Sequence, residues 1–258
     1  YDGGYLLMDV TTKNHFVEQD RRVLQYMRRI VGSDEFINGI ERWCFWITDD
    51  KADAALEIPI IRERADLVRD LRLSKSDKSA QRLAAYPYRF REMHETTTNS
   101  LVIPSVSSEN REYVPVGFID KKTVVTNLAF VIYDCDPWIF GVVSSKMHNL
   151  WIKAVCGGLE TRIRYSSELG YNTFPFPAIT DEQKKDIRNC VNQVIAVREE
   201  EFDKTYAQMY KKGEMSDDLR FAHSMLDLQI ERCYRDEPFV SDDERLDCLF
   251  ELYEKIGG

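Results

Sequence analysis

The segment Leu101–Ile119 reads LVIPSVSSENREYVPVGFI and joins two apolar runs through a polar cluster. Both runs are rich in β-branched residues, which predicts a strand at each end of the cluster. The polar side chains between them, from Ser105 to Glu112, would then stand on a rigid support, which we call the ridge. No nucleophile–base pair occurs in the cluster, so the ridge suits the reading of a donor and acceptor pattern better than catalysis.

Short apolar runs alternate with helical patterns before Pro177. The runs predict strands at Tyr5–Met8, Trp43–Ile47, Leu101–Ile103, Tyr113–Ile119, Thr123–Val125 and Ala129–Tyr133. Apolar residues at helical spacing predict helices over Asp20–Val31, Pro59–Leu73, Pro137–Val143 and Ser145–Val155. This alternation indicates a mixed α/β or α+β domain, and we expect the α+β class over residues 1–178, with a mixed, largely antiparallel sheet.

After Pro177 the apolar period becomes helical throughout. Thr180 with Gln183 and Ser241 with Glu244 have the spacing of capping boxes, which bind the free N–H groups at a helix start. Three amphipathic stripes follow these caps. We therefore expect a small all-α C-terminal region over residues 179–258.

Composition excludes several classes of protein. No apolar run approaches the roughly 20 residues of a membrane span, so no membrane association is expected. The six cysteines are scattered without a C-x-x-C pair and the four histidines are not clustered, which argues against a zinc site. Free thiols of this kind are typical of a reducing, cytoplasmic location. A chain that begins with Tyr1 is expected to be part of a longer protein.

The acidic charge is unevenly distributed. The whole chain carries a net charge of −9, but residues 179–258 hold 12 basic and 20 acidic side chains, which leaves a net charge of −1 for residues 1–178. The stretch from Arg62 to Arg91 contains nine basic residues and four acidic ones. Because charge attraction is screened over about 10 Å, a basic face can bind phosphate while an acidic region points away.

The motifs of the common catalytic sites are absent. The chain has no Gly-x-Gly-x-x-Gly, no P-loop, no Gly-x-Ser-x-Gly and no His-Glu-x-x-His. Asn172-Thr-Phe-Pro-Phe resembles the Asn-Pro-Pro-Tyr of amino-methyltransferases only faintly, since it lacks the consecutive prolines. We therefore expect no catalytic residues and no chemistry in this chain alone.

Four segments in order carry a family resemblance. They are Gly32–Ile47, Leu101–Phe118, Phe140–Gly157 and Arg164–Pro177, followed by a Gln-x-x-x-Ile helix start at Gln183. Together they resemble the target recognition domain and its exit in MmeI-like (type IIL) restriction–modification enzymes. That family joins a nuclease domain, a class I S-adenosylmethionine-dependent adenine methyltransferase domain, a recognition domain and a C-terminal helical region in one polypeptide.

The resemblance implies that this chain is the last two parts of such a polypeptide. It would be a sequence-specific module for double-stranded DNA, with the recognition domain over residues 1–178 and the helical domain over 179–258. Its partners would be double-stranded DNA and the methyltransferase domain of the same parent polypeptide. S-adenosylmethionine and the catalytic motifs are expected in that other domain, with no cofactor in this chain. Some relatives methylate DNA without cutting it, so the resemblance implies a methyltransferase with or without nuclease activity as the parent.

The ridge supplies the side chains that read base edges in the major groove. Arg suits guanine, Asn suits adenine and Glu suits cytosine, and the ridge offers Arg111, Asn110 and Glu109, with Ser107 and Ser108 as adaptable partners. Strand alternation puts Arg111 and Tyr113 on one face, which favours Arg111 as the principal reader. A solvated hairpin turn is the alternative interpretation of these residues.

Other segments are predicted to contact DNA around the ridge. The residues are Thr98 and Asn99 in a polar loop, Ser145, Lys146, His148 and Asn149 at a helix start, and Arg162 and Arg164 in an edge strand or loop. A helix start attracts phosphate through its free N–H groups, although structural capping explains the same pattern. Arg62, Arg69 and Arg72 lie on one helix face and suit either phosphate contact or a solvated surface.

Two other classes of function compete with DNA reading. The chain could be a scaffold that braces the methyltransferase domain without reading DNA, and its acidic helical region suits that role. An RNA-binding module would need exposed aromatic residues on which single-stranded bases stack, and no such platform stands out.

Overall fold

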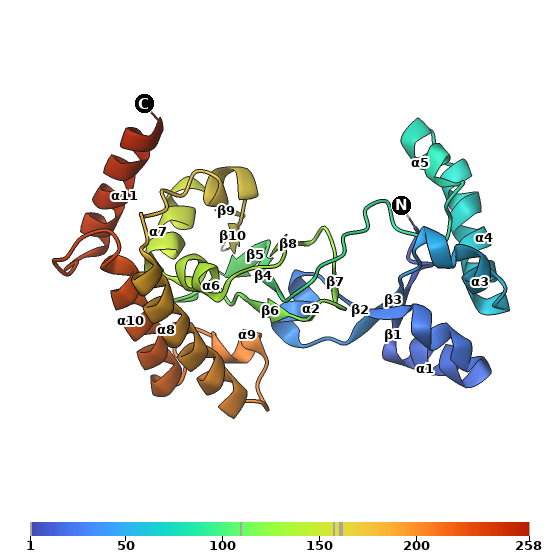
Figure 1. The fold of residues 1–258 in the computed structure, drawn as a ribbon, viewed down its shortest axis with the longest axis horizontal. Helices are drawn as coiled ribbons and strands as arrows, with labels where there is room; N and C mark the ends of the chain where they lie inside the picture. Colours follow the sequence, from blue (N-terminus) through green and yellow to red (C-terminus); the bar gives the residue numbers. More distant parts are fainter. Residues whose placement is uncertain (1, 109, 157, 160–161, 258) are drawn as a thin grey trace. The chain divides into compact units, whose positions relative to one another are not determined.

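Segments that are far apart in the sequence build each of the two units of the computed structural model (Figure 1). The structure describes residues 2–108, 110–156, 158–159 and 162–257. Unit 1 contains Tyr1–Val31, Ile40–Thr97 and Lys121–Thr126, and unit 2 contains Gly32–Gly39, Thr98–Asp120 and Asn127–Gly258.

Unit 1 is a small sheet with helices. Its strands are β1 (Leu7–Asp9), β2 (Met27–Val31), β3 (Arg42–Phe45) and β7 (Val124–Val125), in the order β1-β3-β2-β7. Only the β2–β7 pair among these is parallel. The helical elements are α1 (Val10–Gln19), η1 (Arg21–Tyr26), η2 (Asp49–Lys51), α3 (Ala52–Leu56), α4 (Pro59–Leu73) and α5 (Lys78–Leu83). Leu6, Phe45, Ile58 and Ile61 are among the residues of its core.

The predicted helix over Asp20–Val31 is wrong in its second half. A 3-10 turn, η1, ends at Tyr26, and Met27–Val31 forms β2 in the middle of the sheet. β-branched Ile30 and Val31 pair with Val124 and Val125 of β7. Two neighbouring strands satisfy the backbone of β2, which overrides a weak helical period.

Unit 2 holds two further sheets and most of the helices. One sheet has the order β6-β4-β8, with β4 (Ser100–Pro104), β6 (Gly117–Ile119) and β8 (Ala129–Ile132). The other has the order β5-β10-β9, with β5 (Val106–Ser108), β9 (Gly158–Leu159) and β10 (Arg162–Arg164). All pairs in both sheets are antiparallel. The fold is therefore α+β with largely antiparallel pairing, as predicted.

The helices of unit 2 confirm most of the predicted ones. They are α2 (Ser33–Asn38), α6 (Pro137–Ser144), α7 (Lys146–Val155), the π-turn η3 (Ser167–Tyr171), α8 (Asp181–Glu200), α9 (Tyr206–Met209), α10 (Asp217–Glu231) and α11 (Asp242–Gly257). The Thr180–Gln183 capping box forms, because each residue's side chain accepts from the other's backbone N–H. The C-terminal region is helical, as predicted.

One hydrophobic core joins the β6-β4-β8 sheet to the C-terminal helices of unit 2. Leu101 of β4, Phe140 of α6 and Trp151 of α7 belong to the same cluster as Ile187 of α8 and Leu226 of α10. Figure 1 shows α8 and α10 side by side, and both pack against α6. The separation of residues 1–178 and 179–258 into two domains stays a prediction, since residue 178 lies within unit 2.

Candidate nucleic-acid interface

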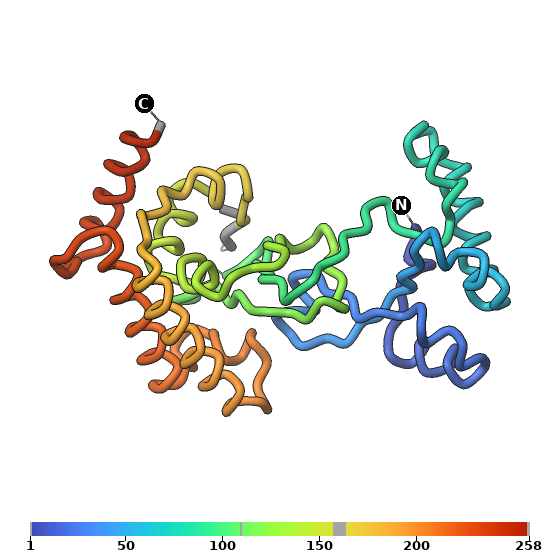
Figure 2. The backbone as a smooth tube through the Cα atoms, viewed as in Figure 1, coloured from blue at the N-terminus to red at the C-terminus, as the bar shows by residue number. Residues whose placement is uncertain are grey.

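The segment Leu101–Ile119 contributes β4 and β6 to one sheet of unit 2 and β5 to the other, as labelled in Figure 1, and Figure 2 traces the same part of the chain as a backbone tube. β4 lies in the centre of its sheet, β5 forms an edge of the second sheet, and β6 returns beside β4 with Ser100 opposite Ile119. The polar cluster is therefore part of a long connection that contains its own strand. It is not a tight hairpin turn.

Ser105 is the pivot at which the chain changes sheets. Its backbone N–H donates to Ser33 Oγ at 2.8 Å, and its hydroxyl donates to the Leu128 carbonyl at 2.6 Å. Its own carbonyl accepts from the backbone N–H of Tyr165 at 2.9 Å. Contacts from α2, the segment before β8 and the end of β10 thus fix the start of the ridge.

A turn follows β5 and presents the polar side chains. Ser108 Oγ accepts from the backbone N–H of Asn110 at 3.3 Å, and the Ser108 carbonyl accepts from that of Arg111 at 3.2 Å. Asn110 is exposed and Ser108 is half-buried, whereas Ser107 points inward and is buried. Glu109 lies outside the described residues.

Arg111 is a partly buried cation that contacts Ser107. Its Nη1 donates to Ser107 Oγ at 3.3 Å, and its guanidinium has no ion-pair partner among the residues that the structure describes. Burial lowers the pKa of Arg111, although an arginine remains charged in proteins. A partly desolvated guanidinium whose hydrogen-bond contact among the described residues is Ser107 is suited to an acceptor on another molecule.

The strand-alternation argument for the ridge is wrong. Residues 110–116 form no strand, so Arg111 and Tyr113 do not share a sheet face. Tyr113 is only 7% exposed, and its hydroxyl donates to Asp227 of α10. The predicted strand over Tyr113–Ile119 shortens to β6 because Pro115 cannot donate to a strand ladder.

β10 brings the predicted phosphate-contacting residues Arg162 and Arg164 beside β5. Arg162 is paired with Ser108 and Arg164 with Val106. The segment is not the predicted edge strand, because β10 lies between β5 and β9. Arg164 is exposed, and its guanidinium has no partner among the described residues, whereas the side chain of Arg162 lies outside the description.

The start of α7 is buried and has a structural role. Ser145 is its N-cap, with its hydroxyl accepting from the backbone N–H of His148. His148 contacts the Tyr165 hydroxyl at 3.1 Å, and Asn149 Nδ2 donates to the Glu112 carbonyl at 2.6 Å. Lys146 is partly exposed, and its ammonium pairs with Asp242 at 2.8 Å. Ser145, His148 and Asn149 are buried, so the predicted contact of these three with DNA is unsupported, and capping explains the pattern.

Thr98 and Asn99 are exposed but lie at the other end of β4. The Thr98 backbone N–H and hydroxyl both donate to the Asp134 carboxylate, at 2.7 and 2.9 Å. Five strand residues separate this loop from Ser105, a distance of about 17 Å along the strand. The structure therefore does not bring Thr98 and Asn99 to the 108–111 turn.

The basic helix α4 does not present a phosphate-tracking stripe. Arg72 is 1% exposed and donates to the carbonyls of Leu83, Tyr86 and Arg89 at 2.7–2.9 Å. Arg69 pairs with Asp66, three residues earlier on the same helix. One arginine of the predicted stripe is thus part of the interior of unit 1.

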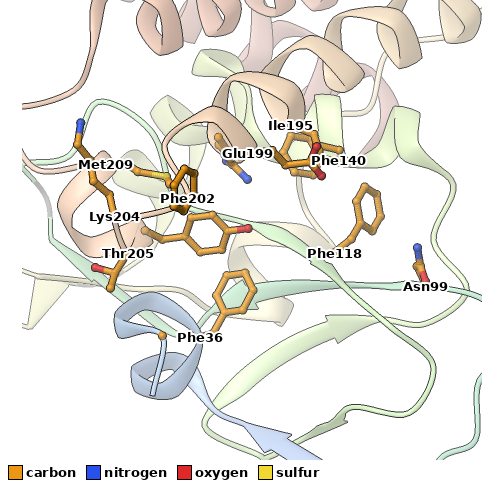
Figure 3. A pocket seen from close by; sticks show the side chains of 13 residues that line it. Phe36, Asn99, Phe118, Phe140, Ile195, Glu199, Phe202, Lys204, Thr205 and Met209 are labelled. Atoms are coloured by element: carbon orange, nitrogen blue, oxygen red, sulfur yellow. The ribbon is translucent and has the colours of Figure 1, made fainter. Parts of the chain in front are cut away.

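A cavity of about 520 Å³ lies in unit 2 (Figure 3). Phe36, Phe118 and Phe202 contribute rings to it, and Figure 3 shows Asn99 at its margin. Its lining has no acid–base pair suited to catalysis.

No cluster of metal-ligating side chains occurs within the described ranges. None of the helices in the described part of the chain has the length and apolarity to span a membrane.

Two buried histidines make the stability of unit 2 sensitive to acid. Burial lowers the pKa of His148 to about 3 from an ordinary 6.5, and burial beside Arg198 lowers the pKa of His223 as well. Each imidazole gains a proton only on unfolding below pH 6.5, so its contribution to stability is complete above that pH and is lost as the pH falls. Burial raises the pKa of Asp227 to about 6 from 3.8, which acts in the opposite direction between those values.

We therefore expect the free energy of unfolding to fall between pH 6 and pH 5, by something on the order of 1 kcal/mol, because two histidines lose stability there and only one aspartate opposes them. Denaturant unfolding at the two pH values measures it, and hydrogen exchange assigns the change to unit 2. Equal stability at both pH values contradicts the expectation.

Models of known protein families match nearly the whole chain. The family model described as MmeI, target recognition domain, matches residues 1–178, and the one described as MmeI, C-terminal domain, matches residues 179–257. The chain belongs to the MmeI family. The first match contains the four segments that carry the resemblance, and the second contains the helix start at Gln183.

Two relatives match nearly the whole of this chain and are themselves longer. DNA methyltransferase A of Bacillus subtilis (strain 168) is 40% identical over 255 residues, which are 99% of this chain and 29% of that protein. The solved structure of the type IIL restriction–modification enzyme MmeI in complex with DNA is 34% identical, with a TM-score of 0.93, over 99% of this chain and 34% of that one. The chain thus spans about a third of the length of each relative.

Residues that the sequence reasoning missed lie on α10. Asp227 accepts from Tyr113 next to the ridge, and His223 stacks on the same tyrosine ring at 4.2 Å. The available signal was that both residues fall on the apolar stripe of α10, which also contains Leu226 and Ile230. A titratable residue on a core-facing stripe requires a buried partner.

Proposed function

We propose that this chain is the DNA-reading part of an adenine-N6-specific, S-adenosylmethionine-dependent DNA methyltransferase. It recognises a specific sequence in double-stranded DNA and directs a methyltransferase domain of the same polypeptide to it, in the cytoplasm. The observation that carries the proposal is the match of residues 1–178 to the MmeI target recognition domain. The relatives add support, since one is named a DNA methyltransferase and the other was solved with DNA.

The need for a recognition module follows from the chemistry. A methyltransferase that acts on a base must take that base out of the duplex, which costs a few kcal/mol. Contacts with phosphates set the register of a protein on DNA, and contacts with base edges set its sequence preference. A module that binds one sequence tightly therefore supplies the energy for base extrusion at that sequence.

The 108–111 turn is the proposed reading element, with Arg111 as its principal reader. Its guanidinium is already partly desolvated, so contact with guanine O6 and N7 costs less desolvation than contact by an exposed arginine. Ser108, Glu109 and Asn110 are the proposed companions of Arg111. Arg164 and Arg162 on the adjacent β10 are proposed to contact phosphate, and Thr98, Asn99 and Lys146 are assigned to more distant parts of the interface.

Replacing Arg111 by alanine tests the proposal. The preferred sequence of the wild-type chain is first found by selection from a pool of randomised duplexes. Binding is then measured to that duplex and to every duplex with one base pair changed. We expect Arg111→Ala to lose about 10- to 100-fold discrimination at one base pair and to keep it at the others.

Arg164→Ala is the matched control, because it removes the same type of side chain from the neighbouring strand. If Arg164 contacts a phosphate, its loss should weaken binding to all duplexes alike. The slope of the logarithm of the binding constant against the logarithm of the salt concentration should become shallower by about one. A folded Arg111→Ala protein with unchanged base preferences would sink the assignment of Arg111. A wild-type chain without any base preference would refute DNA reading itself and leave the scaffold role.

A further inference from the structure

Helices of the C-terminal region hold the chain directly after the 108–111 turn. Arg220 of α10 donates to the Glu112 carboxylate at 3.1 Å, and Asp227 of α10 accepts from the Tyr113 hydroxyl at 2.7 Å. Arg198 of α8 donates to the Val116 carbonyl at 2.7 Å. Three side chains from residues beyond 178 thus bind a segment that begins one residue after Arg111.

The Tyr113–Asp227 contact is the most buried of these. Both residues are at most 7% exposed, and His223 stacks on the Tyr113 ring with 4.2 Å between the ring centroids and an interplanar angle of 20°. The second oxygen of Asp227 accepts from the backbone N–H of Lys146 at 2.7 Å. Asp227 therefore links α10, the start of α7 and the exit of the ridge through one carboxylate.

We propose that Asp227 and Tyr113 are positioning residues for base recognition, through which α10 sets the place of Arg111. This inference rests on the proposed function and adds a specificity role for the C-terminal helical region. Neither residue touches DNA on this view. They act by restricting the backbone two residues away from the reader.

The geometry explains why this restriction matters for discrimination. A bidentate contact with guanine needs both hydrogen bonds near 2.9 Å, and a shift of about 1 Å in the guanidinium breaks that geometry. Before Arg111, Ser108 fixes the turn through two backbone contacts. After Arg111 there is no strand to hold the chain until β6. The buried side-chain contacts of residues 112–116 take over that role.

Tyr113→Phe and Asp227→Asn test the inference in the full 258-residue chain. The phenylalanine keeps the stack on His223 and removes only the hydroxyl. The asparagine keeps the shape of Asp227 and can still accept from the backbone of Lys146. Each variant should lower discrimination at the base pair read by Arg111 by about three- to tenfold, with binding to non-specific duplex unchanged. The double variant should lose no more than the stronger single one, because both remove the hydrogen bond that the Tyr113 hydroxyl donates to the Asp227 carboxylate.

The pH dependence separates positioning from general destabilisation. The groups around the Asp227 carboxyl are Tyr113, Lys146 and Glu231, with neutral His223 on the same helix. Asp242 pairs with Lys146, and Arg245 pairs with Glu231. Since burial raises the pKa of Asp227 to about 6, its charged contact with Tyr113 weakens below that pH.

Wild-type discrimination at the Arg111 base pair should therefore fall between pH 7 and pH 5, and Asp227→Asn should abolish this pH dependence. Stability should behave in the opposite manner. Asp227→Asn removes the one contribution among these groups that opposes acid unfolding by His148 and His223, so its loss of stability with acid becomes steeper. A residue with a merely structural role would change discrimination and stability together.

Tyr234→Phe is the matched control. It removes a partly buried tyrosine hydroxyl of unit 2 that donates to the Pro175 carbonyl at 3.1 Å, away from the ridge. It should leave every base preference unchanged. If Arg111→Ala loses discrimination while folded Tyr113→Phe and Asp227→Asn retain it at all pH values, the positioning role is overturned and DNA reading stands. If the wild-type chain shows no base preference, the proposed function fails first.

Discussion

Replacing Trp151 by alanine should lower the free energy of unfolding by about 3–5 kcal/mol, the usual cost of removing a buried tryptophan. Trp151 of α7 is 1% exposed. Its ring lies 5.1 Å from that of Phe250 and 5.5 Å from that of Tyr253, both on α11, and its Nε1 donates to Thr173 Oγ1 at 3.2 Å. The substitution thus leaves a cavity and also removes the main contact of α11 with α7.

Denaturant unfolding measures this loss, and hydrogen exchange shows where it occurs. Amides of α7 and α11 should lose protection, while those of unit 1 should change little. Phe221→Ala is the control, since Phe221 is 64% exposed on α10 and its truncation should cost less than about 0.5 kcal/mol. A Trp151→Ala protein as stable as Phe221→Ala would contradict the packing described for unit 2.

Replacing Arg72 by methionine should destabilise unit 1 by about 3–5 kcal/mol, the cost of breaking a buried charged group's hydrogen bonds. Arg72 donates three hydrogen bonds to backbone carbonyls between Leu83 and Arg89. Methionine has similar length but no donor. Its introduction leaves these carbonyls without the partner that organises the chain after α5.

The matched control for Arg72 is Arg69→Met on the same helix. The Arg69 side chain is 44% exposed and pairs with Asp66 near the surface, a contact worth about 0–1 kcal/mol. Unfolding curves of the two variants should therefore differ widely, and proteolysis within residues 83–89 should increase only for Arg72→Met. Equal stabilities would mean that Arg72 is not the organising residue of that segment.

Local patterns in the sequence predicted the elements that depend on local contacts. Pro59–Leu73 forms α4 with the predicted ends, because proline suits the first helical turn and the apolar spacing is helical. The Thr180–Gln183 cap starts α8 as predicted. Met27–Val31 differs because two neighbouring strands satisfy its backbone, and no signal within the segment records those neighbours.

The candidate site could be predicted in part. The resemblance and the residue types selected the turn that contains Arg111, and the structure leaves that arginine partly exposed without a carboxylate partner among the described residues. Ser145, His148 and Asn149 had equally polar signatures but are buried. A polar pattern at a helix start is the same for a cap and for a phosphate site, since both use the free N–H groups.

The α+β class, the helical C-terminal region and the family were all predictable from the residues alone, because neighbouring residues carry the periodicity, the caps and the ordered segments. Tertiary structure alone decided which charged side chains remain available to a partner. Arg72 became a bridge between carbonyls, and Asp227 came to bind Tyr113, 114 residues earlier in the chain. Burial and pairing depend on segments that meet only after folding. The local sequence around an arginine or aspartate is therefore the same whether the side chain ends at the surface or in the interior.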